Sequence, residues 1–299
     1  MTTPLQKLFF FVCAAALLAC AGCAALAEDA AALPIDFSGG MPLQAQFFTG
    51  TWSYEDPTIS VSIVQKRYSG PHYDCDYWVA DIKIAHPSQL RTMAANGFDD
   101  FVTEEYGAVI ARRVNAVLAI DGDYFTYTGE GYILRQGEVY LNVLKGRRDI
   151  LLVDEDGDFH IVRYARKEDA VSEINGKKVI NAFYFGPALI NNGTIVWDMD
   201  LRADMMAEEG RQRMCIAQVG PLEYKCICCA GPARGSGGMT MMEFARAVAK
   251  EGVQTAYNLD GGDSCMMIFN GEKINDVGNK SMRKITDIVY FASAYGADQ

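Results

Sequence analysis

The chain has 299 residues, half of them apolar, and a formal net charge of −11. This composition is that of a globular protein with room for one large domain or two small ones. The chain is acidic and has no run of basic residues, so it lacks the basic surface that would bind nucleic acid or an anionic membrane. A phosphate-bearing substrate would therefore be held by local donors, since the overall field repels it.

The N-terminus has the pattern of a secretory signal. Lys7 precedes an apolar run over residues 8–18, and small residues follow as far as Ala27. A positive start, an apolar stretch and an A-x-A ending predict a signal peptide over residues 1–27 and an exported chain, secreted or associated with the cell envelope. Cleavage after Ala27 removes one charged residue, Lys7, and takes the net charge from −11 to −12. The run before Cys20 also resembles a lipoprotein signal, so membrane anchoring through a lipidated Cys20 stays open.

The mature chain is expected to be a single domain over residues 57–299, preceded by a wrapping or flexible segment over residues 28–56. Alternation of apolar and polar residues predicts strands at 58–64 and 77–84. A helix at 103–114 is expected to lead into an apolar strand at 116–120. Hairpins are predicted for 132–135 with 139–141, for 150–153 with 159–164, and for 188–190 with 194–196.

A further hairpin is predicted from strands 213–219 and 224–230. If its loop is the four residues 220–223, Cys215 falls opposite Cys228 on one face of the sheet, within bridging distance. Six cysteines lie outside the signal, and the pattern allows either disulfides or small buried core residues.

Near the C-terminus the pattern becomes strand, helix, strand. A strand at 224–229 runs into a glycine-rich loop, a helix is expected at 241–251, and a strand at 255–259. Such a unit predicts parallel strands with a right-handed crossover. Together with the hairpins it predicts the α+β class, with a mixed, twisted β-sheet flanked by helices.

Two loops of this unit are predicted to share one edge of the sheet. The first carries Arg234, Gly237 and Gly238 before a helix, an arrangement that suits an anion but equally a plain capping turn. The second carries two carboxylates among glycines and is otherwise a turn with solvated aspartates. Its candidate binding or catalytic residues are Asn258, Asp260, Gly261, Gly262, Asp263 and Ser264.

A third candidate loop follows the strand at 116–120. Asp121, Asp123 and Tyr124 place two carboxylates and an aromatic ring together, as suits sugar hydroxyls and stacking, although an ordinary Asp-Gly turn has the same residues.

An ordered series of motifs resembles the phosphodiester glycosidase family. The segments are AIDGDYF at 119–125, FGPALI at 185–190, QRMCIAQ at 212–218, and GPARGSGGMTMMEFA followed by YNLDGGDSCMM. The series covers roughly residues 115–290. Two positions depart from the family pattern: Asp121 replaces an asparagine, and Asp263 replaces a glycine.

The resemblance implies a hydrolase that cleaves a sugar-1-phosphodiester, of the N-acetylglucosamine type or from a cell-envelope glycan or exopolysaccharide. Arg213 and Arg234, with loop N–H groups, would bind the phosphate, and Asp260 or secondly Asp123 would activate water or attack the anomeric carbon. No cofactor is expected. Two alternatives stay open: a non-catalytic protein that binds envelope polysaccharide, and a site for Mg²⁺ or Ca²⁺ at the aspartate loops.

Overall fold

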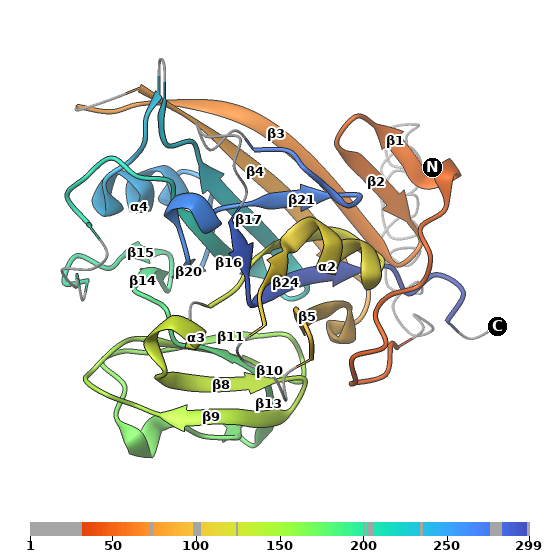
Figure 1. Ribbon diagram of the computed structural model, residues 1–299, viewed down its shortest axis with the longest axis horizontal. Coiled ribbons are helices and arrows are strands. Elements are labelled where there is room, and N and C mark those ends of the chain that lie inside the picture. Colours follow the sequence, from red (N-terminus) through yellow and green to blue (C-terminus); the bar gives the residue numbers. More distant parts are fainter. Residues whose placement is uncertain are drawn as a thin grey trace, which may run out of the picture.

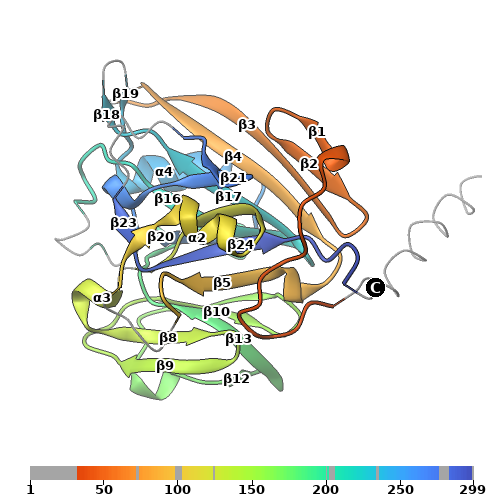
Figure 2. The same ribbon diagram turned by 45° about the vertical axis from the view of Figure 1, so that its right-hand side comes forward.

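The computed structural model describes residues 32–71, 74–97, 103–123, 125–199, 201, 206–233, 236–275 and 283–297. The predicted signal peptide and Cys20 therefore lie outside the described residues. In this part of the chain, strands dominate and stack as a large sheet, a middle sheet and a third sheet (Figures 1 and 2). No helix among these residues is both long and apolar enough to cross a membrane.

The large sheet carries both strands of the predicted C-terminal unit. Its strands in order are β1 (Phe48–Gly50), β2 (Ser53–Asp56), β3 (Ile59–Ser69), β4 (Asp74–Ile84), β17 (Glu223–Cys229), β16 (Met214–Gly220), β20 (Thr255–Leu259), β14 (Ala188–Asn191) and β15 (Thr194–Ile195).

The middle sheet is the most deeply buried. Its order is β22 (Glu272–Lys273), β21 (Met267–Phe269), β7 (Ala116–Asp121), β24 (Asp287–Ala292) and β5 (Leu90–Ala94). One face packs on the large sheet through side chains such as Ile120 and Val289. The other packs on helix α2 (Gly107–Arg113) through Ala119 and Tyr290. Every residue of β5, β7 and β24 is buried, because both faces are covered.

The third sheet has its own small core. Its order is β11 (Phe159–Val162), β10 (Ile150–Asp154), β13 (Lys177–Phe183), β8 (Gly131–Arg135) and β9 (Glu138–Val143), with β12 (Glu173–Ile174) beside β13. Two short ribbons pair β18 (Pro232–Ala233) with β19 (Ser236–Gly237), and β6 (Glu105–Tyr106) with β23 (Lys284–Ile285). The other helical pieces are α3 (Phe125–Thr128), α4 (Met241–Ala249), η1 (Ala45–Phe47), η2 (Pro87–Gln89), η3 (Lys167–Asp169) and η5 (Gly262–Ser264).

The predicted α+β class with a mixed, helix-flanked sheet is wrong. The described strands pair antiparallel into several sheets, and the helices are few and short. The predicted crossover from β17 through α4 to β20 exists, but β16 lies between the two strands and is antiparallel to both. β17 and β20 therefore run in the same direction without pairing, and their loops still reach one edge of the sheet.

The three other predicted hairpins are confirmed as β8–β9, β10–β11 and β14–β15. The hairpin β16–β17 has a tighter turn than expected, because Gly220 pairs with Glu223 and the turn is Pro221-Leu222. A β-bulge between Gln218 and Gly220 then shifts the register by one residue, so that Cys215 faces Ile227. The predicted pairing of Cys215 with Cys228 is therefore wrong.

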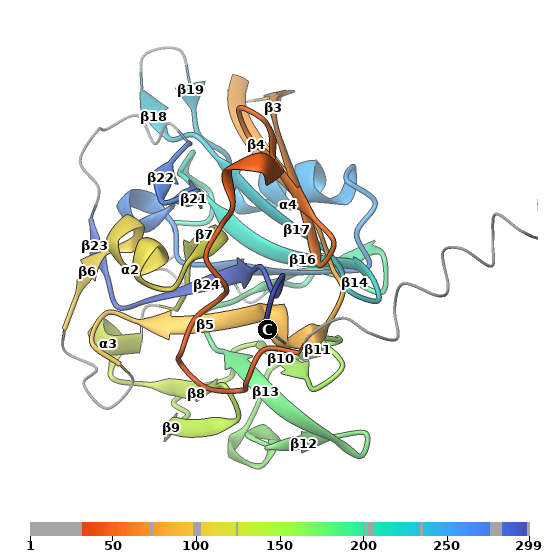
Figure 3. The ribbon, with the colours of Figure 1, turned by 90° about the vertical axis from the view of Figure 1, so that its right-hand side faces the viewer.

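An N-terminal strap, residues 33–41, crosses the molecule over β5 and β24 (Figure 3). Gly40 N–H donates to the Val114 carbonyl at 2.9 Å, and Met41 N–H to that of Ser293 at 3.0 Å. The strap is also held by Arg91, a fully buried residue of β5. The Arg91 guanidinium donates to the carbonyl oxygens of Pro34 and Asp36, both at 2.8 Å.

Replacing Arg91 with methionine should destabilise the fold by about 2–4 kcal/mol, because the hydrogen bonds of its guanidinium are lost and the Pro34 carbonyl loses its donor, although Gln136 still donates to the Asp36 carbonyl. Urea unfolding of Arg91→Met against wild type measures this difference. The matched control is Lys83→Met, which removes an exposed ion pair with Glu223 and should leave stability nearly unchanged. Equal effects of the two substitutions would contradict the structural role of Arg91.

Candidate active site

Four aspartates come together where the ends of the large and middle sheets meet. Asp121 ends β7 and Asp123 follows it, Asp260 follows β20, and Asp287 begins β24. The two sheets are joined at this point, since Asp260 N–H donates to the carbonyl of Gly122 at 3.3 Å. Asp121, Asp123 and Asp260 line a small cavity together with Gly122, Lys284, Ile285 and Thr286.

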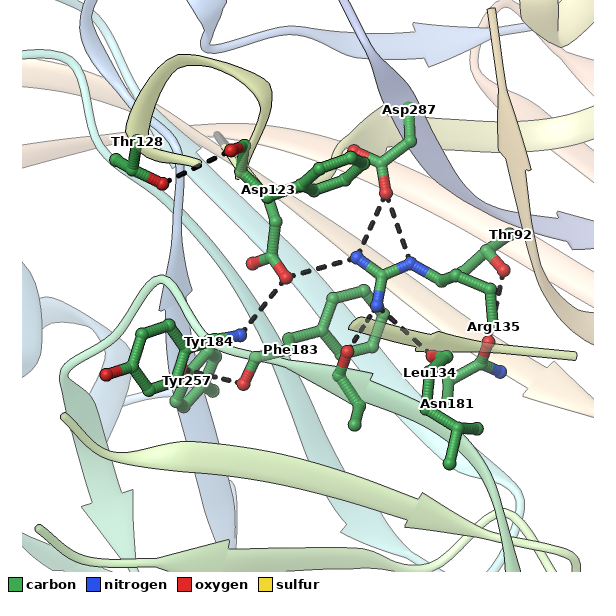
Figure 4. Close-up of polar contacts among 12 residues, drawn as sticks. Thr92, Asp123, Thr128, Leu134, Arg135, Asn181, Phe183, Tyr184, Tyr257 and Asp287 are labelled. Atoms are coloured by element: carbon green, nitrogen blue, oxygen red, sulfur yellow. Dashed lines mark hydrogen bonds and ion pairs between the residues drawn. The ribbon is translucent and has the colours of Figure 1, made fainter. Parts of the chain in front are cut away.

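The third sheet supplies the counter-charge. Arg135, at the end of β8, is fully buried, and its guanidinium lies between Asp123 and Asp287 (Figure 4). Its Nη2 is 3.1 Å from Asp123 Oδ2 and 3.0 Å from Asp287 Oδ2. The guanidinium also stacks on the Phe183 ring, with its central carbon 4.3 Å from the ring centroid. One cation thus fixes two buried carboxylates from the middle sheet.

Gly122 allows the carboxylates to approach one another. A Cβ at this position would lie only 2.4 Å from Asp287 Oδ1. The backbone of Gly122 contributes as well, since its N–H donates to the carbonyl of Asp287 at 3.2 Å. A side chain here would separate β24 from the loop that carries Asp123, so glycine is required by the close packing.

Burial raises the pKa of each carboxyl group in the cluster. The pKa of Asp260 rises to about 6 through burial, against the opposing hydrogen bond from Gly261 N–H at 2.8 Å. The pKa of Asp287 rises to about 7 through burial, although Arg135 lowers it. Burial and the nearby Asp260 hold the pKa of Asp121 well above its usual range. Burial also raises the pKa of Asp123, again opposed by Arg135.

Oxygen atoms in the cluster lack hydrogen-bond donors among the described residues. They are Asp121 Oδ2, Asp123 Oδ1 and Asp287 Oδ1, each from a buried carboxyl group. Their partner oxygens are bonded: Asp121 Oδ1 accepts from Met266 N–H at 2.9 Å, and Asp123 Oδ2 accepts from Tyr184 N–H at 3.1 Å. The cluster therefore has acceptor capacity for hydroxyl or N–H groups of a ligand.

Arg213 lies just before β16, beneath the loop that carries Asp260. A Cβ on Gly261 would be 3.8 Å from the Arg213 Cα and 2.7 Å from the Gln212 carbonyl oxygen, so the loop rests on this backbone. The buried guanidinium donates to the carbonyls of Met206 at 2.8 Å and of Glu209 at 3.1 Å. Arg213 thus fixes a neighbouring segment at the same edge of the sheet.

The remaining predicted site residues occupy different positions. Asn258 is buried on β20, and its amide donates to the Gly186 carbonyl at 2.8 Å. In the short helix η5, Gly262 begins the turn, Asp263 is exposed and Ser264 is buried. Gly237 ends β19, and Gly238 follows with a φ of 72° against the Arg211 backbone. Tyr124 and Arg234 lie outside the described residues.

Sequence reasoning missed Arg135 and Asp287. Both are charged residues within otherwise apolar strands, YILR and DIVYFA, which is the signal that a search for buried charges would use. The residues that line the opening beside Asp260, Lys284 and Thr286, were also not singled out. As for a metal, no group of three or more His, Cys, Asp or Glu side chains within the described ranges has the geometry to hold an ion.

Comparisons with known proteins place this site in a family of hydrolases. A family model described as phosphodiester glycosidase matches residues 114–292, more than half of the chain and the part that contains all four aspartates and Arg135. The chain belongs to the phosphodiester glycosidase family.

Individual relatives are distant. The SPbeta prophage-derived uncharacterized protein YomE of Bacillus subtilis is 22% identical over 250 residues, which cover 81% of this chain and only 38% of that protein. A solved structure with the same fold is the catalytic domain of the zebrafish N-acetylglucosamine-1-phosphodiester alpha-N-acetylglucosaminidase, auto-inhibited by its pro-peptide. Its TM-score is 0.65, and the sequences are 17% identical over 80% of this chain and 84% of that one. A hypothetical protein from Synechocystis reaches a TM-score of 0.51 at 14% identity, over 78% of this chain and 62% of that one.

Removing the charge of Arg135 should destabilise the protein, and more so at high pH. Without it, Asp123 and Asp287 have even higher pKa values, so the native state binds protons that the unfolded chain releases above about pH 4. Unfolding by urea should show that Arg135→Met costs about 3–5 kcal/mol at pH 8 and less at pH 5. The exposed Arg166, 3.8 Å from Glu168, is the control, and Arg166→Met should show neither effect. A loss for Arg135→Met that does not change with pH would contradict this role.

Proposed function

We propose that the protein hydrolyses the bond between the anomeric carbon of a sugar and the phosphate of a phosphodiester, releasing the free sugar and a phosphomonoester. The observation that carries the proposal is the cluster of four buried or half-buried aspartates with raised pKa values, inside the region that matches the family. Paired carboxyl groups with separated pKa values are the machinery of glycoside hydrolysis.

Asp260 is assigned the role of base or nucleophile. It is only half-buried, it lines the cavity, and with a pKa of about 6 it is largely ionised near neutral pH. Its carboxylate would activate water or attack the anomeric carbon through an oxocarbenium-like transition state. The departing phosphomonoester leaves as an anion and needs little protonation.

Asp121 and Asp123 are assigned to the sugar. Burial and the nearby Asp260 hold the pKa of Asp121 well above its usual range, which favours the protonated form that can donate one hydrogen bond. Asp123 is held rigidly by Arg135 and by Tyr184 N–H, and its Oδ1 is directed at no described donor. These groups complement the alternating donors and acceptors of sugar hydroxyls.

The phosphate is assigned to the edge formed by Arg213 and the loop N–H groups beside it. The Arg213 backbone lies beneath the Asp260 loop, and its guanidinium is proposed as the local positive charge that holds an anion against the repulsion of the acidic chain. Arg234, from the glycine-rich loop, is proposed as a second phosphate ligand. Export to the cell envelope, proposed from the pattern of residues 1–27, makes an envelope glycan phosphodiester the substrate class to examine first.

Asp260→Asn should abolish turnover of an N-acetylglucosamine-1-phosphodiester, at least 10³-fold in kcat, without unfolding the protein. Because burial opposes the charge of Asp260, the variant should melt at the same temperature as wild type at pH 7 or a few degrees higher. Product analysis and thermal melting test both parts. The exposed carboxylate of β9 provides the control, Glu138→Gln, which should keep full activity. A fully active Asp260→Asn would refute the assignment.

The product itself decides the reaction class. Free sugar with a phosphomonoester supports the proposal. Sugar 1-phosphate with the free alcohol would mean cleavage on the other side of phosphorus and would refute it. Tight binding of a panel of sugar phosphodiesters without any product would instead establish a glycan-binding protein.

The acid limb of the pH profile should report Asp260. Its carboxylate forms only above a pKa of about 6, so kcat/KM should be level above pH 7 and fall about tenfold per pH unit well below 6. A profile that stays level down to pH 4.5 would show that no carboxylate of raised pKa acts as base.

A further inference from the structure

Six cysteines lie among the described residues, all of them buried thiols. Two are adjacent in sequence on β17, Cys228 and Cys229. Successive side chains of a strand point to opposite faces of its sheet. In the register of the sheet, Cys228 lies opposite Met214 of β16 and Trp78 of β4, and Cys229 lies opposite Tyr77 of β4. Each of the two thiols meets another cysteine on its own face.

Cys228 meets Cys265, the residue that directly follows η5. The two thiols lie within hydrogen-bonding reach of each other. The backbone agrees with this contact: Cys265 Sγ is 3.3 Å from the Arg213 carbonyl oxygen, and that same oxygen accepts from Cys229 N–H at 3.0 Å. The end of the Asp260 loop is therefore packed directly on β17.

Cys229 meets Cys75 near the start of β4. The Cys229 thiol lies beside that of Cys75, and its Sγ donates to the Arg211 carbonyl at 3.4 Å. Again the backbone agrees, since Cys75 Sγ lies 3.4 Å from the carbonyl oxygen of Ala230, and Ala230 N–H donates to the Asp76 carbonyl at 2.8 Å. The pair lies diagonally across neighbouring strands on one face of the sheet.

The remaining two cysteines have no cysteine directly opposite on the neighbouring strands that the structure describes, and Cys215 has Asn258 of β20 on its other side. Cys215 faces Ile227, and Cys226 lies between Ile216 and Ala80. Both are fully buried within the main core.

We propose that Cys228–Cys265 and Cys75–Cys229 form two disulfides when the chain folds in an oxidising medium, while Cys215 and Cys226 stay thiols. In each bond two thiols lose two protons and two electrons to a disulfide oxidant such as glutathione disulfide, which is reduced to two thiols. The first bond ties the Asp260 loop to β17, and the second ties β17 to β4. The proposal does not depend on the proposed hydrolysis.

Tryptic mapping tests the connectivity. The full chain is reduced in denaturant, refolded in a glutathione redox buffer, alkylated in denaturant and digested. The proposal predicts one cross-linked species made of peptides 68–83, 226–234 and 251–273, with one alkylated cysteine, Cys226, in its central peptide. Peptide 214–225 should appear alone and alkylated at Cys215. Complete alkylation of Cys265 or Cys75, or a cross-link to Cys215, would overturn the proposal.

Two variants separate the two bonds. Cys265→Ser should release peptide 251–273 while 68–83 stays linked to 226–234, and the matched core variant Cys226→Ser should keep all three linked. Reductant should lower the melting temperature of the oxidised wild type by roughly 5–10 °C, and that of Cys265→Ser by clearly less. An equal shift in wild type and Cys265→Ser would mean that the Cys228–Cys265 bond does not form.

Discussion

The buried guanidinium of Arg135 is the interaction on which the candidate site depends. It comes from the third sheet and pairs with two carboxylates that begin or follow strands of the middle sheet. A cation buried without partners costs several kcal/mol, and so does each carboxylate. Because the three groups compensate one another only in one arrangement, they fix the third sheet against the middle one at the point where chemistry is proposed.

The joint between the large and middle sheets places the remaining carboxyl group. β16 pairs with both β17 and β20. The strand that follows Arg213 therefore also fixes the position of Asp260 at the end of β20. The hydrogen bond from Asp260 N–H to Gly122 then connects this loop with the aspartates after β7. The clustered aspartates have raised pKa values, so burying them in ionised form costs folding free energy that neutral residues would not cost. Clusters of this kind are common at active sites.

Local patterns in the sequence predicted the parts of this structure that depend on local chemistry. The hairpins with glycine turns and the strand of β20 were predictable, and so were Asp121, Asp123 and Asp260, which follow apolar strands beside glycines. The class of the fold was not, because β5, β7 and β24 are buried on both faces and show no alternation to read. Arg135 and Asp287 were missed since they are 152 residues apart, and nothing local to either shows that the other lies opposite. The register of β16–β17 was wrong by one residue because a β-bulge lies between Gln218 and Gly220, and the local sequence does not show that a residue is inserted there.

The N-terminal strap sets a limit on how far the chain can be trimmed by proteases. Processing that stops before Leu33 leaves the strap and its contacts with Arg91 complete. A cut a few residues later would remove the carbonyls of Pro34 and Asp36 and leave a fully buried cation without them. Any cleavage near the N-terminus that preserves the fold would therefore have a boundary fixed by Arg91, which lies 57 residues further along the chain than the Pro34 carbonyl it binds.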